Sequence, residues 1–572
     1  MNAETKTCQN CKQSFVIESE DFDFYRKIAV PSPTFCPDCR MKRRLVWRNE
    51  RNLYKRRDDA IGKEIFAGFA PDAKIKIYEK EYWISDAWDP LQYGKAYDFS
   101  RSFFEQFREL AYAVPWPSRS IQRLINADYC DQASDLKNCY LCFNCDRIED
   151  SAYVMRSMDI KNSFDLTQVI ESELCYEGVV LNKCYRTFFS EDCEASFDVW
   201  FSKNCIGCTN CFGSANARNK SYYFFNEQLS KTEYEQQIDA LQLHSWSGLN
   251  KAAARAAAHL ARFPVKYFHG VRAVGSAGDY LRDTKNVARS WFVKDGQDIK
   301  YSQIVYVAKD SYDFTVWGNG GSLMYECLTC GEGVNGLKFC FDCWPSCRDL
   351  EYCISCRSSS DLFGCVGLQK KQYCIFNKQY SKEEYFALRE KIIEHTKEVP
   401  YRNAKGHVYT YGEFFPEEFS PFAHNETSLG DTFPLTKEEV VARGYSWHEP
   451  EAKDYKVTMR VEDLPDSILD VPESVTNELI SCAACKRAYR IIVSELAFFK
   501  RIGIPLPRRC VSCRLIDRLS KINKPIFYHR QCDCASGHFH GKKSCPIEFE
   551  TSYAPDRPEI VYCEQCYNAE VV

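Results

Sequence analysis

The sequence predicts a mainly β fold with α segments, in which two terminal zinc ribbons flank a duplicated β-solenoid region built of parallel β-coils. Three observations support this prediction. The 32 cysteines gather in three parts of the chain, residues 1–211, 327–374 and 482–566. A cysteine pattern near the N-terminus recurs near the C-terminus. Between them, two central blocks carry short repeats of strand length, which are typical of a solenoid.

Composition limits the class of protein. The 572 residues, 45% of them hydrophobic, are enough for several domains with their own cores. Lys and Arg (75) are balanced by Asp and Glu (79), so binding to nucleic acid would need a local basic patch. The chain has no apolar run of about 18 residues and no secretory signal, so we expect no membrane association. Clustered cysteines without a signal peptide indicate a cytoplasmic protein with metal sites.

The terminal pattern consists of two Cys-x2-Cys pairs, and we expect the segment between the pairs to form a β-hairpin. Each pair makes a tight knuckle, and two knuckles complete a tetrahedral four-thiolate zinc site. The segment 482–531 repeats the segment 8–57 without a gap, with 16 identities in 50 positions. The predicted zinc ligands are Cys8, Cys11, Cys36 and Cys39 in the first ribbon and Cys482, Cys485, Cys510 and Cys513 in the second.

The order Cys-x2-Cys-x3-Phe/Tyr, followed by Pro-x-Pro-x2-Cys-x2-Cys-Arg, resembles the "probable zinc-ribbon" domain family of uncharacterised bacterial proteins. The residues that carry the resemblance run from Cys8 to Arg40 and again from Cys482 to Arg514, with their flanks about a fifth of the chain. Residues 548–558 are also similar to large hypothetical proteins of candidate-phylum bacteria. The resemblance implies zinc binding and no established activity.

The internal similarity continues beyond the ribbons, where residues 70–83 match residues 554–567. The C-terminal copy holds the knuckle Cys563-x2-Cys566, whereas Glu79 and Tyr82 replace these cysteines in the first copy. We therefore expect the first copy to hold no metal and to depend on apolar packing.

The C-terminal module is expected to bind a third zinc ion, so that the chain carries about three Zn²⁺. The predicted ligands are Cys534, Cys545, Cys563 and Cys566, with Cys532, His538 and His540 as alternatives.

Small-plus-aromatic pairs such as Cys175-Tyr176 and Tyr352-Cys353 recur at steps of 9–14 residues in the central blocks, which are rich in Asn, Asp and Gly. We expect two such repeats to make one coil of about 20–25 residues, with small side chains inside and aromatic ladders. Two irregular antiparallel meanders are the alternative.

Several solenoid cysteines are also spaced by three residues, as in Cys139-x2-Cys142-x2-Cys145. Residues i and i+3 of an extended strand face opposite sides, and a buried cysteine behaves as a small apolar side chain, so packing is the favoured interpretation. Zinc or an iron–sulfur cluster are the alternatives.

Helices are expected at residues 100–110 and 252–262. The predicted domain order is an N-terminal ribbon with a basic arm (1–60), a metal-free segment plus helix (61–126), a first solenoid block (127–230), a helical linker (231–275), a second solenoid block (276–380), a helix with a Pro- and aromatic-rich connector (381–475), a second ribbon (476–530) and a C-terminal zinc module (531–572).

A basic arm follows the first ribbon. Half of the positions from 40 to 57 are basic, with aromatic residues interleaved, a mixture that suits phosphate contacts and base stacking. A solvated helix face is the alternative. The predicted nucleic-acid contacts are Arg43, Arg44, Trp47, Arg48, Arg51, Arg56 and Arg57.

No phosphate-binding loop, catalytic triad or metalloprotease motif is found, so no catalytic residue and no small-molecule substrate are assigned. The leading hypothesis is a non-enzymatic, multi-zinc protein that binds RNA or DNA through its ribbons and basic arms. The first alternative is a scaffold that binds protein partners on the solenoid surface. The second is a metal-dependent or redox enzyme that uses the solenoid cysteines.

Overall fold

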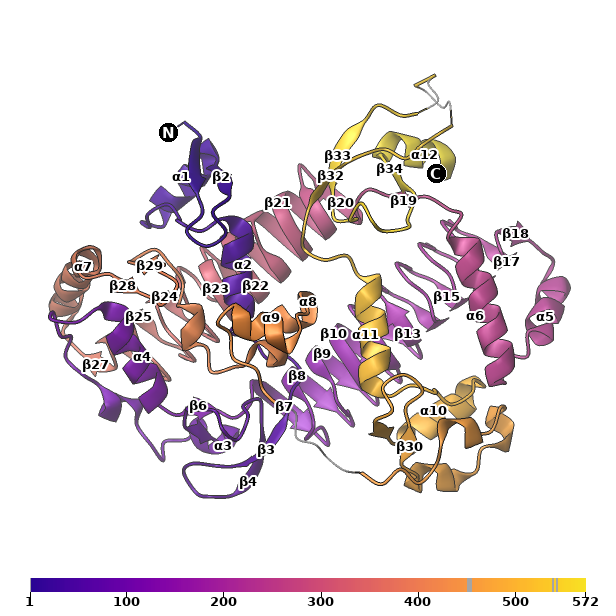
Figure 1. The fold of residues 1–572 in the computed structure, drawn as a ribbon, viewed down its shortest axis with the longest axis horizontal. Helices are drawn as coiled ribbons and strands as arrows, with labels where there is room; N and C mark the ends of the chain where they lie inside the picture. The colour runs from indigo at the N-terminus through magenta and orange to yellow at the C-terminus, as the bar shows by residue number, and fades with distance from the viewer. Residues whose placement is uncertain (1, 450–454, 537–539, 542–543, 572) are drawn as a thin grey trace. The chain divides into compact units, whose positions relative to one another are not determined.

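The computed structural model describes residues 2–449, 455–536, 540–541 and 544–571. The chain is mainly β and divides into two compact units, each of which combines one solenoid with a module from the opposite end of the sequence (Figure 1). Unit 1 comprises Met1–Arg119, Phe268–Glu449 and Lys524–Tyr528, and unit 2 comprises Ser120–Tyr267, Pro450–Asn523 and His529–Val572. The predicted ribbons therefore do not lie on the solenoid that is next to them in sequence.

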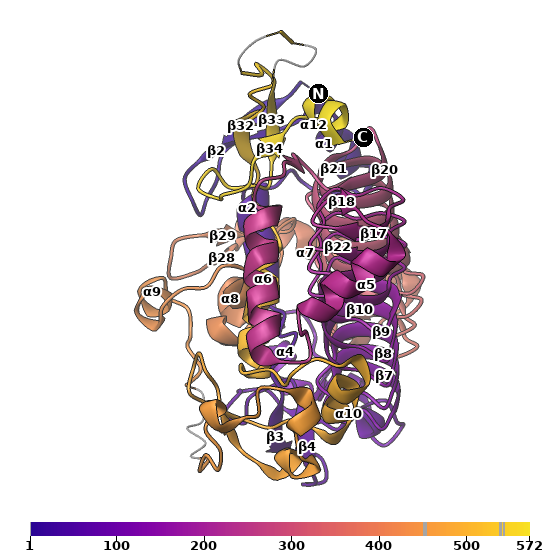
Figure 2. The same ribbon diagram turned by 90° about the vertical axis from the view of Figure 1, so that its right-hand side faces the viewer.

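The first solenoid lies in unit 2, and its strands pair in parallel until the last one. Cys145 pairs with Ala133 on one side and with Ser157 on the other, so one coil takes 12 residues. The coils stack side by side, as Figure 2 shows for β7 to β10. The strands are β7 (Ile121–Ile125), β8 (Asp131–Lys137), β9 (Phe143–Glu149), β10 (Ala152–Lys161), β11 (Phe164–Thr167), β12 (Ile170–Glu173), β13 (Tyr176–Val179), β14 (Tyr185–Phe188), β15 (Phe197–Trp200), β16 (Thr209–Phe212), β17 (Ser221–Phe224) and β18 (Glu227–Gln228).

The second solenoid lies in unit 1 and has the same parallel pairing. Val293 pairs with Val305 at a spacing of 12, and Phe314 pairs with Cys327 at a spacing of 13. The parallel pairing confirms the predicted solenoid, but the predicted coil length, with two repeats in each coil, is wrong, because each short repeat closes a coil by itself. The strands are β20 (Gly270–Val274), β21 (Ala277–Lys300), β22 (Gln303–Ser322), β23 (Tyr325–Gly331), β24 (Arg348–Glu351), β25 (Ser360–Phe363), β26 (Gln372–Ile375) and β27 (Lys378–Gln379).

A backbone period of three residues makes so short a coil feasible. Every third residue over long stretches adopts the left-handed conformation, for example Asn138 (φ 53°), Leu141 (φ 51°) and Asn144 (φ 54°). Each such residue turns the chain, so that side chains three positions apart face the same way. The residue after most of these turns is buried inside the coil, as in Cys139, Cys142, Cys145 and Ile148. The Cys-x2-Cys spacing in the solenoids is therefore the period of the interior.

Left-handed backbone is unfavourable for most residues, but Asn and Asp tolerate it. Their side chains also form hydrogen-bonded ladders between successive coils. The amide of Asn126 donates to Asn138 (3.1 Å), and the amide of Asn138 donates to Asp150 (2.8 Å). These ladders account for the abundance of Asn and Asp in the repeats.

Aromatic ladders run along the coils, as predicted. Phe189 stacks on Phe201 with ring centroids 4.6 Å apart, and Tyr280 stacks on Phe292 at 4.1 Å. Such contacts stabilise a solenoid because each coil buries apolar surface only against its neighbours.

Both solenoids end in the same way. The amide of Asn226 accepts from the backbone N–H of Ala215 and donates to its carbonyl, both at 2.8 Å. Asn377 makes the same pair of hydrogen bonds with Val366, at 2.9 and 2.8 Å. A helix then begins at a Ser N-cap with a capping box in each case, α5 (Lys231–Ala240) and α7 (Lys382–Glu398).

The predicted helices are present as α4 (Phe103–Ala113) and α6 (Trp246–Leu260). None of the described helices combines the length and the apolar character needed to cross a bilayer. The other helices are α1 (Ser19–Lys27), α2 (Pro37–Leu45), α3 (Lys80–Trp83), α8 (Ser428–Thr432), α9 (Lys437–Ala442), α10 (Val493–Ile502), α11 (Val511–Lys521) and α12 (Glu564–Val571). The remaining strands are β1 (Glu4–Thr7), β2 (Ser14–Ile17), β3 (Tyr54–Arg57), β4 (Glu64–Ala67), β5 (Ile77–Tyr78), β6 (Trp116–Pro117), β19 (Val265–Lys266), β28 (Tyr401–Arg402), β29 (Val408–Tyr409), β30 (Ile480–Ser481), β31 (Ala488–Tyr489), β32 (Tyr528–Gln531), β33 (Glu548–Thr551) and β34 (Val561–Tyr562).

Candidate metal centres and the helices they hold

The first candidate metal centre is formed by the four predicted cysteines, Cys8, Cys11, Cys36 and Cys39, whose sulfur atoms all lie within 4.8 Å of one another. The first knuckle is the turn of the β1–β2 hairpin, and the second begins helix α2, with Cys36 as its N-cap. The Sγ atoms of Cys11 and Cys36 are 3.7 Å apart. This agrees with the edge of about 3.8 Å that follows from a tetrahedral site with Zn–S bonds of about 2.3 Å.

The second candidate centre repeats this geometry with Cys482, Cys485, Cys510 and Cys513. The backbone N–H of Cys510 donates to Cys482 Sγ at 3.3 Å, and the equivalent bond from Cys36 to Cys8 is also 3.3 Å. Burial opposes ionisation, but the backbone N–H groups of Cys485 and Cys510 lower the pKa of Cys482 to about 6. A thiol with a lowered pKa is prepared to bind a cation as the thiolate.

The spacer between the knuckles differs from the prediction. We expected a β-hairpin in these residues, but the spacer contains helix α1 in the first module and helix α10 in the second. The hairpin lies around the first knuckle instead. Helix α1 brings Phe24 into contact with the second solenoid, where its ring stacks on that of Tyr312 with the ring centroids 3.9 Å apart.

The third candidate centre, in the C-terminal module, consists of Cys532, Cys545, Cys563 and Cys566. Cys532 therefore takes the place that the prediction gave to Cys534. It follows strand β32 and accepts a hydrogen bond from the backbone N–H of Cys563 (3.2 Å), which fixes it beside the knuckle. Cys534 lies instead in a second group with His540 and Cys566. The alternative ligand His538 lies outside the described residues.

In the N-terminal segment that we predict to hold no metal, Asp58 occupies the sequence position equivalent to Cys532. Its carboxylate accepts hydrogen bonds from the backbone N–H groups of Ala60 and Ile61, both at 2.7 Å, and of Glu79. The buried carboxylate of Asp58 thus joins the ends of β3 and β5, as the four-cysteine metal centre would join the ends of β32 and β34 in the C-terminal module. Trp83, fully buried, supplies the predicted apolar packing.

Asp58→Ala is therefore expected to lower the free energy of unfolding by about 1–3 kcal/mol, since it removes the shared acceptor of three partly buried N–H groups. The metal content should not change. Glu79→Ala should also leave the metal content unchanged, whereas Cys563→Ser should lower it. Urea denaturation and elemental analysis measure the two effects. Metal loss on changing Glu79 would contradict the metal-free assignment.

The solenoid cysteines are packed in the coil interior. Cys340 is fully buried, and its thiol donates to the carbonyl of Lys338 (3.3 Å) and to that of Leu350 in the next coil (3.4 Å). Serines at inward positions make the same two bonds, as Ser196 does with Glu194 and Cys205. Among the described residues, no solenoid cysteine belongs to a group of three or more ligand atoms within 4.8 Å.

Replacing a solenoid cysteine by serine is consequently expected to be mild. Cys340→Ser should change the free energy of unfolding by less than about 1.5 kcal/mol, because serine already fits this position in other coils. Elemental analysis should give an unchanged metal content. Loss of one ion would show that the solenoid cysteines bind metal after all.

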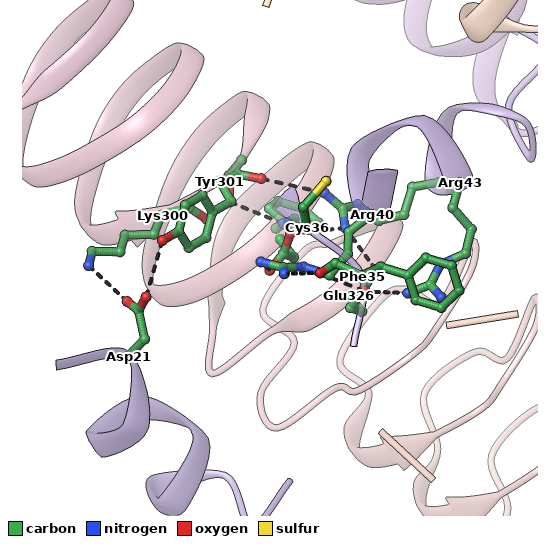
Figure 3. Close-up of polar contacts among 12 residues, drawn as sticks. Asp21, Phe35, Cys36, Arg40, Arg43, Lys300, Tyr301 and Glu326 are labelled. Carbon is green, nitrogen blue, oxygen red and sulfur yellow. Dashed lines mark hydrogen bonds and ion pairs between the residues drawn. The ribbon is translucent and has the colours of Figure 1, made fainter. Parts of the chain in front are cut away.

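The helix that begins at the first metal centre also fixes the N-terminal module to the second solenoid. Helix α2 lies against β22 and β23 (Figure 1) and inserts three arginines among solenoid and connector carboxylates. Figure 3 shows two of them, Arg40 and Arg43, beside Glu326. Arg40 pairs with Asp313 at 2.8 Å, and Arg44 pairs with Glu326 at 2.7 Å. Arg43 lies between Glu326 (2.6 Å) and Glu413 (2.9 Å). We call this set of ion pairs the arginine dock of unit 1.

Burial would raise the pKa of Glu326, but Arg43, Arg44 and Arg40 together lower it. The Glu326 carboxylate is therefore ionised, whereas burial raises the pKa of Asp313 despite the nearby guanidinium groups of Arg40 and Arg44. Beside the dock, Lys300 (2.8 Å) and Tyr301 (3.1 Å) both donate to Asp21 of helix α1 (Figure 3).

Four of the seven predicted nucleic-acid contacts are buried, which corrects the prediction for these four residues. Arg43, Arg44, Trp47 and Arg48 have exposed fractions of 0–2%, so these four side chains are not available to a phosphate or a base in this fold. Arg48 bonds to Glu50 (3.0 Å) and Thr329 (2.6 Å). Of the other predicted contacts, Arg51 pairs with Asp431, Arg56 pairs with Asp59, and Arg57 is exposed.

Unit 2 contains an equivalent arginine dock. Helix α11 lies against β11 and β13, and Arg518 pairs with Asp165 (2.8 Å) and Glu177 (3.0 Å). Arg514 pairs with Asp165 (3.0 Å) and Glu495 (2.9 Å). Three further contacts of unit 1 recur in unit 2. Arg44–Thr315 (3.1 Å) corresponds to Arg518–Thr167 (3.2 Å), and Asp21–Tyr301 (3.1 Å) corresponds to Glu495–Tyr153 (3.2 Å). The ring pair Phe24–Tyr312 (3.9 Å) corresponds to Phe498–Phe164 (4.6 Å).

Comparison with known proteins adds no family. No protein-family model matches the chain, and no curated protein is similar to it. Among solved structures, a match to a protein described as an acetyltransferase, from Desulfovibrio desulfuricans G20, has 8% identity and covers 50% of this chain and 87% of that one. Its TM-score of 0.10 carries no argument about fold or function.

Proposed function

We propose that this chain is a non-enzymatic scaffold, in which zinc centres fix the terminal modules to the solenoids and the exposed solenoid surface binds a protein partner. One observation carries the proposal. The helix that begins at a cysteine knuckle is the helix that carries the docked arginines, Arg40 and Arg44 in α2 and Arg514 and Arg518 in α11.

The ligand sets support a structural role for the metal. Each four-cysteine group would supply all four ligands of a tetrahedral site, and a closed site of this kind stabilises a fold rather than activating a substrate. Tetrahedral thiolate ligands also favour zinc over harder cations. The metal would order the first turn of α2 or α11 and so hold its arginines in line with the solenoid carboxylates.

The exposed surface of the first solenoid favours a protein partner over nucleic acid. A shallow cavity of about 640 Å³ there is lined by side chains of both signs. Lys137 pairs with Glu149 at 2.8 Å, Lys161 lies 3.6 Å from the same carboxylate, and Arg147 pairs with Asp159 at 2.6 Å. A polyanion such as nucleic acid would be repelled by the carboxylate beside each of these Lys and Arg side chains. A protein surface with alternating positive and negative charges would complement both.

The proposal is tested by titrating the metal-loaded chain with RNA and with single-stranded DNA at several salt concentrations. We expect no salt-dependent binding, because the arginine side chains between Arg43 and Arg48 are buried. A fall of log K with log salt at a slope of about −3 to −5 would overturn the proposal and favour nucleic-acid binding, the competing hypothesis.

A positive test uses charge reversal on the solenoid surface. Lys137→Glu combined with Lys161→Glu should weaken, by at least tenfold, any protein partner captured from cell extract and re-measured in purified form. Lys382→Glu combined with Lys391→Glu, on the exposed face of α7, is the matched control and should leave binding unchanged. Equal binding by all three proteins would show that this surface is not the docking face.

A further inference from the structure

The C-terminal module holds more metal-ligand groups than one ion can use. One group of sulfur atoms consists of Cys532, Cys545, Cys563 and Cys566, and a second group consists of Cys534, His540 and Cys566. Within each group all ligand atoms lie within 4.8 Å of one another, and Cys566 belongs to both. Among the described residues, the two ribbon centres have no such second group.

We propose that the C-terminal module binds two metal ions that share the thiolate of Cys566. The first ion takes the four cysteines of the first group. The second ion takes Cys534, the imidazole of His540 and the bridging sulfur of Cys566, with its fourth position left for a ligand from outside the chain. The inference rests on the zinc binding in the proposed function, and it is independent of the proposed partner.

Local structure places the ligands for both ions. Cys566 lies in the first turn of α12, and its backbone N–H donates to Cys563 Sγ at 3.5 Å. The backbone N–H of Cys545 donates to the carbonyl of Cys534 at 3.1 Å, which joins the two ends of the loop between these cysteines. The side-chain amide of Gln531 adds a hydrogen bond to the carbonyl of Cys545 (2.8 Å). Together these two bonds hold Cys545 beside Cys534 and the end of β32.

Charge also favours two ions over one. The five cysteines of the module are at most 4% exposed. One Zn²⁺ with four thiolates carries a net charge of −2 and leaves Cys534 unused. Two Zn²⁺ with five thiolates carry a net charge of −1, because His540 binds as the neutral imidazole. Burying the smaller net charge costs less free energy.

The open position defines what the second ion would bind. Zinc sites with three protein ligands keep the fourth place for water or for an exogenous ligand, whereas four-thiolate sites are closed. Since the second ion would have soft ligands, we expect it to accept water, an exogenous thiolate or an imidazole.

Metal content of the full chain tests the proposal. We expect four zinc ions per chain, three in Cys534→Ser and in His540→Ala, and two in Cys566→Ser. Cys485→Ser, in a ribbon, is the matched control and should also lose one ion without affecting the C-terminal module. Three ions in the unchanged chain, with no loss in Cys534→Ser, would overturn the second site.

Cadmium substitution separates a bridged pair from a collapsed module. The ¹¹³Cd NMR spectrum should show four resonances, two of them coupled to each other through Cys566. Cys534→Ser should remove one of the coupled pair and leave the two ribbon resonances unchanged, which shows that the fold is retained. Four uncoupled resonances would overturn the bridge. Absence of the ribbon resonances would contradict the proposed function instead, whatever the C-terminal module binds.

Discussion

Arg44→Ala is expected to lower the free energy of unfolding of unit 1 by about 3–5 kcal/mol, as measured by urea denaturation. The guanidinium is fully buried and pairs with both Asp313 (3.3 Å) and Glu326 (2.7 Å). Truncation would leave these buried carboxylates short of one positive charge and without its hydrogen bonds. The loss exceeds that of a surface ion pair because water cannot replace the arginine.

Arg57→Ala is the matched control, since Arg57 is an exposed arginine of the same arm. It should change stability by no more than about 0.5 kcal/mol. Arg518→Ala, at the equivalent position of unit 2, should cost about as much as Arg44→Ala. A cost below about 1 kcal/mol for both buried arginines would show that the docks are hydrated and do not hold the modules.

Cys482→Ser is expected to have the second large effect. The variant should lose one metal ion, and the second ribbon should become disordered. A structural zinc site contributes about 10–16 kcal/mol to the folding of an isolated finger at neutral pH, more than a module of this size gains from packing. Elemental analysis should show one ion fewer. Limited proteolysis should cleave the variant between residues 482 and 523, where we expect the unchanged chain to resist.

The loss should also reach the solenoid, because α11 carries Arg514 and Arg518 into the coils with Asp165 and Glu177. Hydrogen exchange in β11 and β13 should accelerate in Cys482→Ser. Cys340→Ser serves as the control for loss of a thiol and should alter neither metal content nor exchange in these strands. Normal exchange in the metal-depleted variant would show that the dock forms without metal.

The sequence predicted best what depends on neighbours in the chain. Two Cys-x2-Cys knuckles are local structures, so the ribbon cysteines that their spacing selected do come together in two groups of four. The predicted coil length was wrong because the left-handed turn at every third residue does not require a particular residue type. Leu141 and Arg147 adopt this conformation, as Asn138 does. Nor could spacing separate Cys532 from Cys534, since the choice depends on where β32 ends.

The arginines were misassigned for a different reason. Arg44 and its partner Asp313 are separated by 269 residues. The segment 40–57 therefore looks strongly basic by itself, although distant carboxylates neutralise its arginines in the folded chain. The signal that could have identified the partners is an acid after the ladder tyrosine, in Tyr312-Asp313 and Tyr325-Glu326. The sequence shows the acidic residues at those positions, but it does not show that they are buried, because their burial depends on helix α2, which lies far away in the sequence.

This separation has a consequence for biosynthesis. Arg44 is made 269 residues before Asp313, and Asp165 is made 353 residues before Arg518. At about 5–20 residues per second, the first helix waits roughly 15–55 s on the ribosome before its acceptor coil exists. Closing so long a loop costs about 5 kcal/mol of chain entropy. Neither unit can reach its final state while the nascent chain is half made, and early metal capture would keep the waiting arginine helix folded in the meantime.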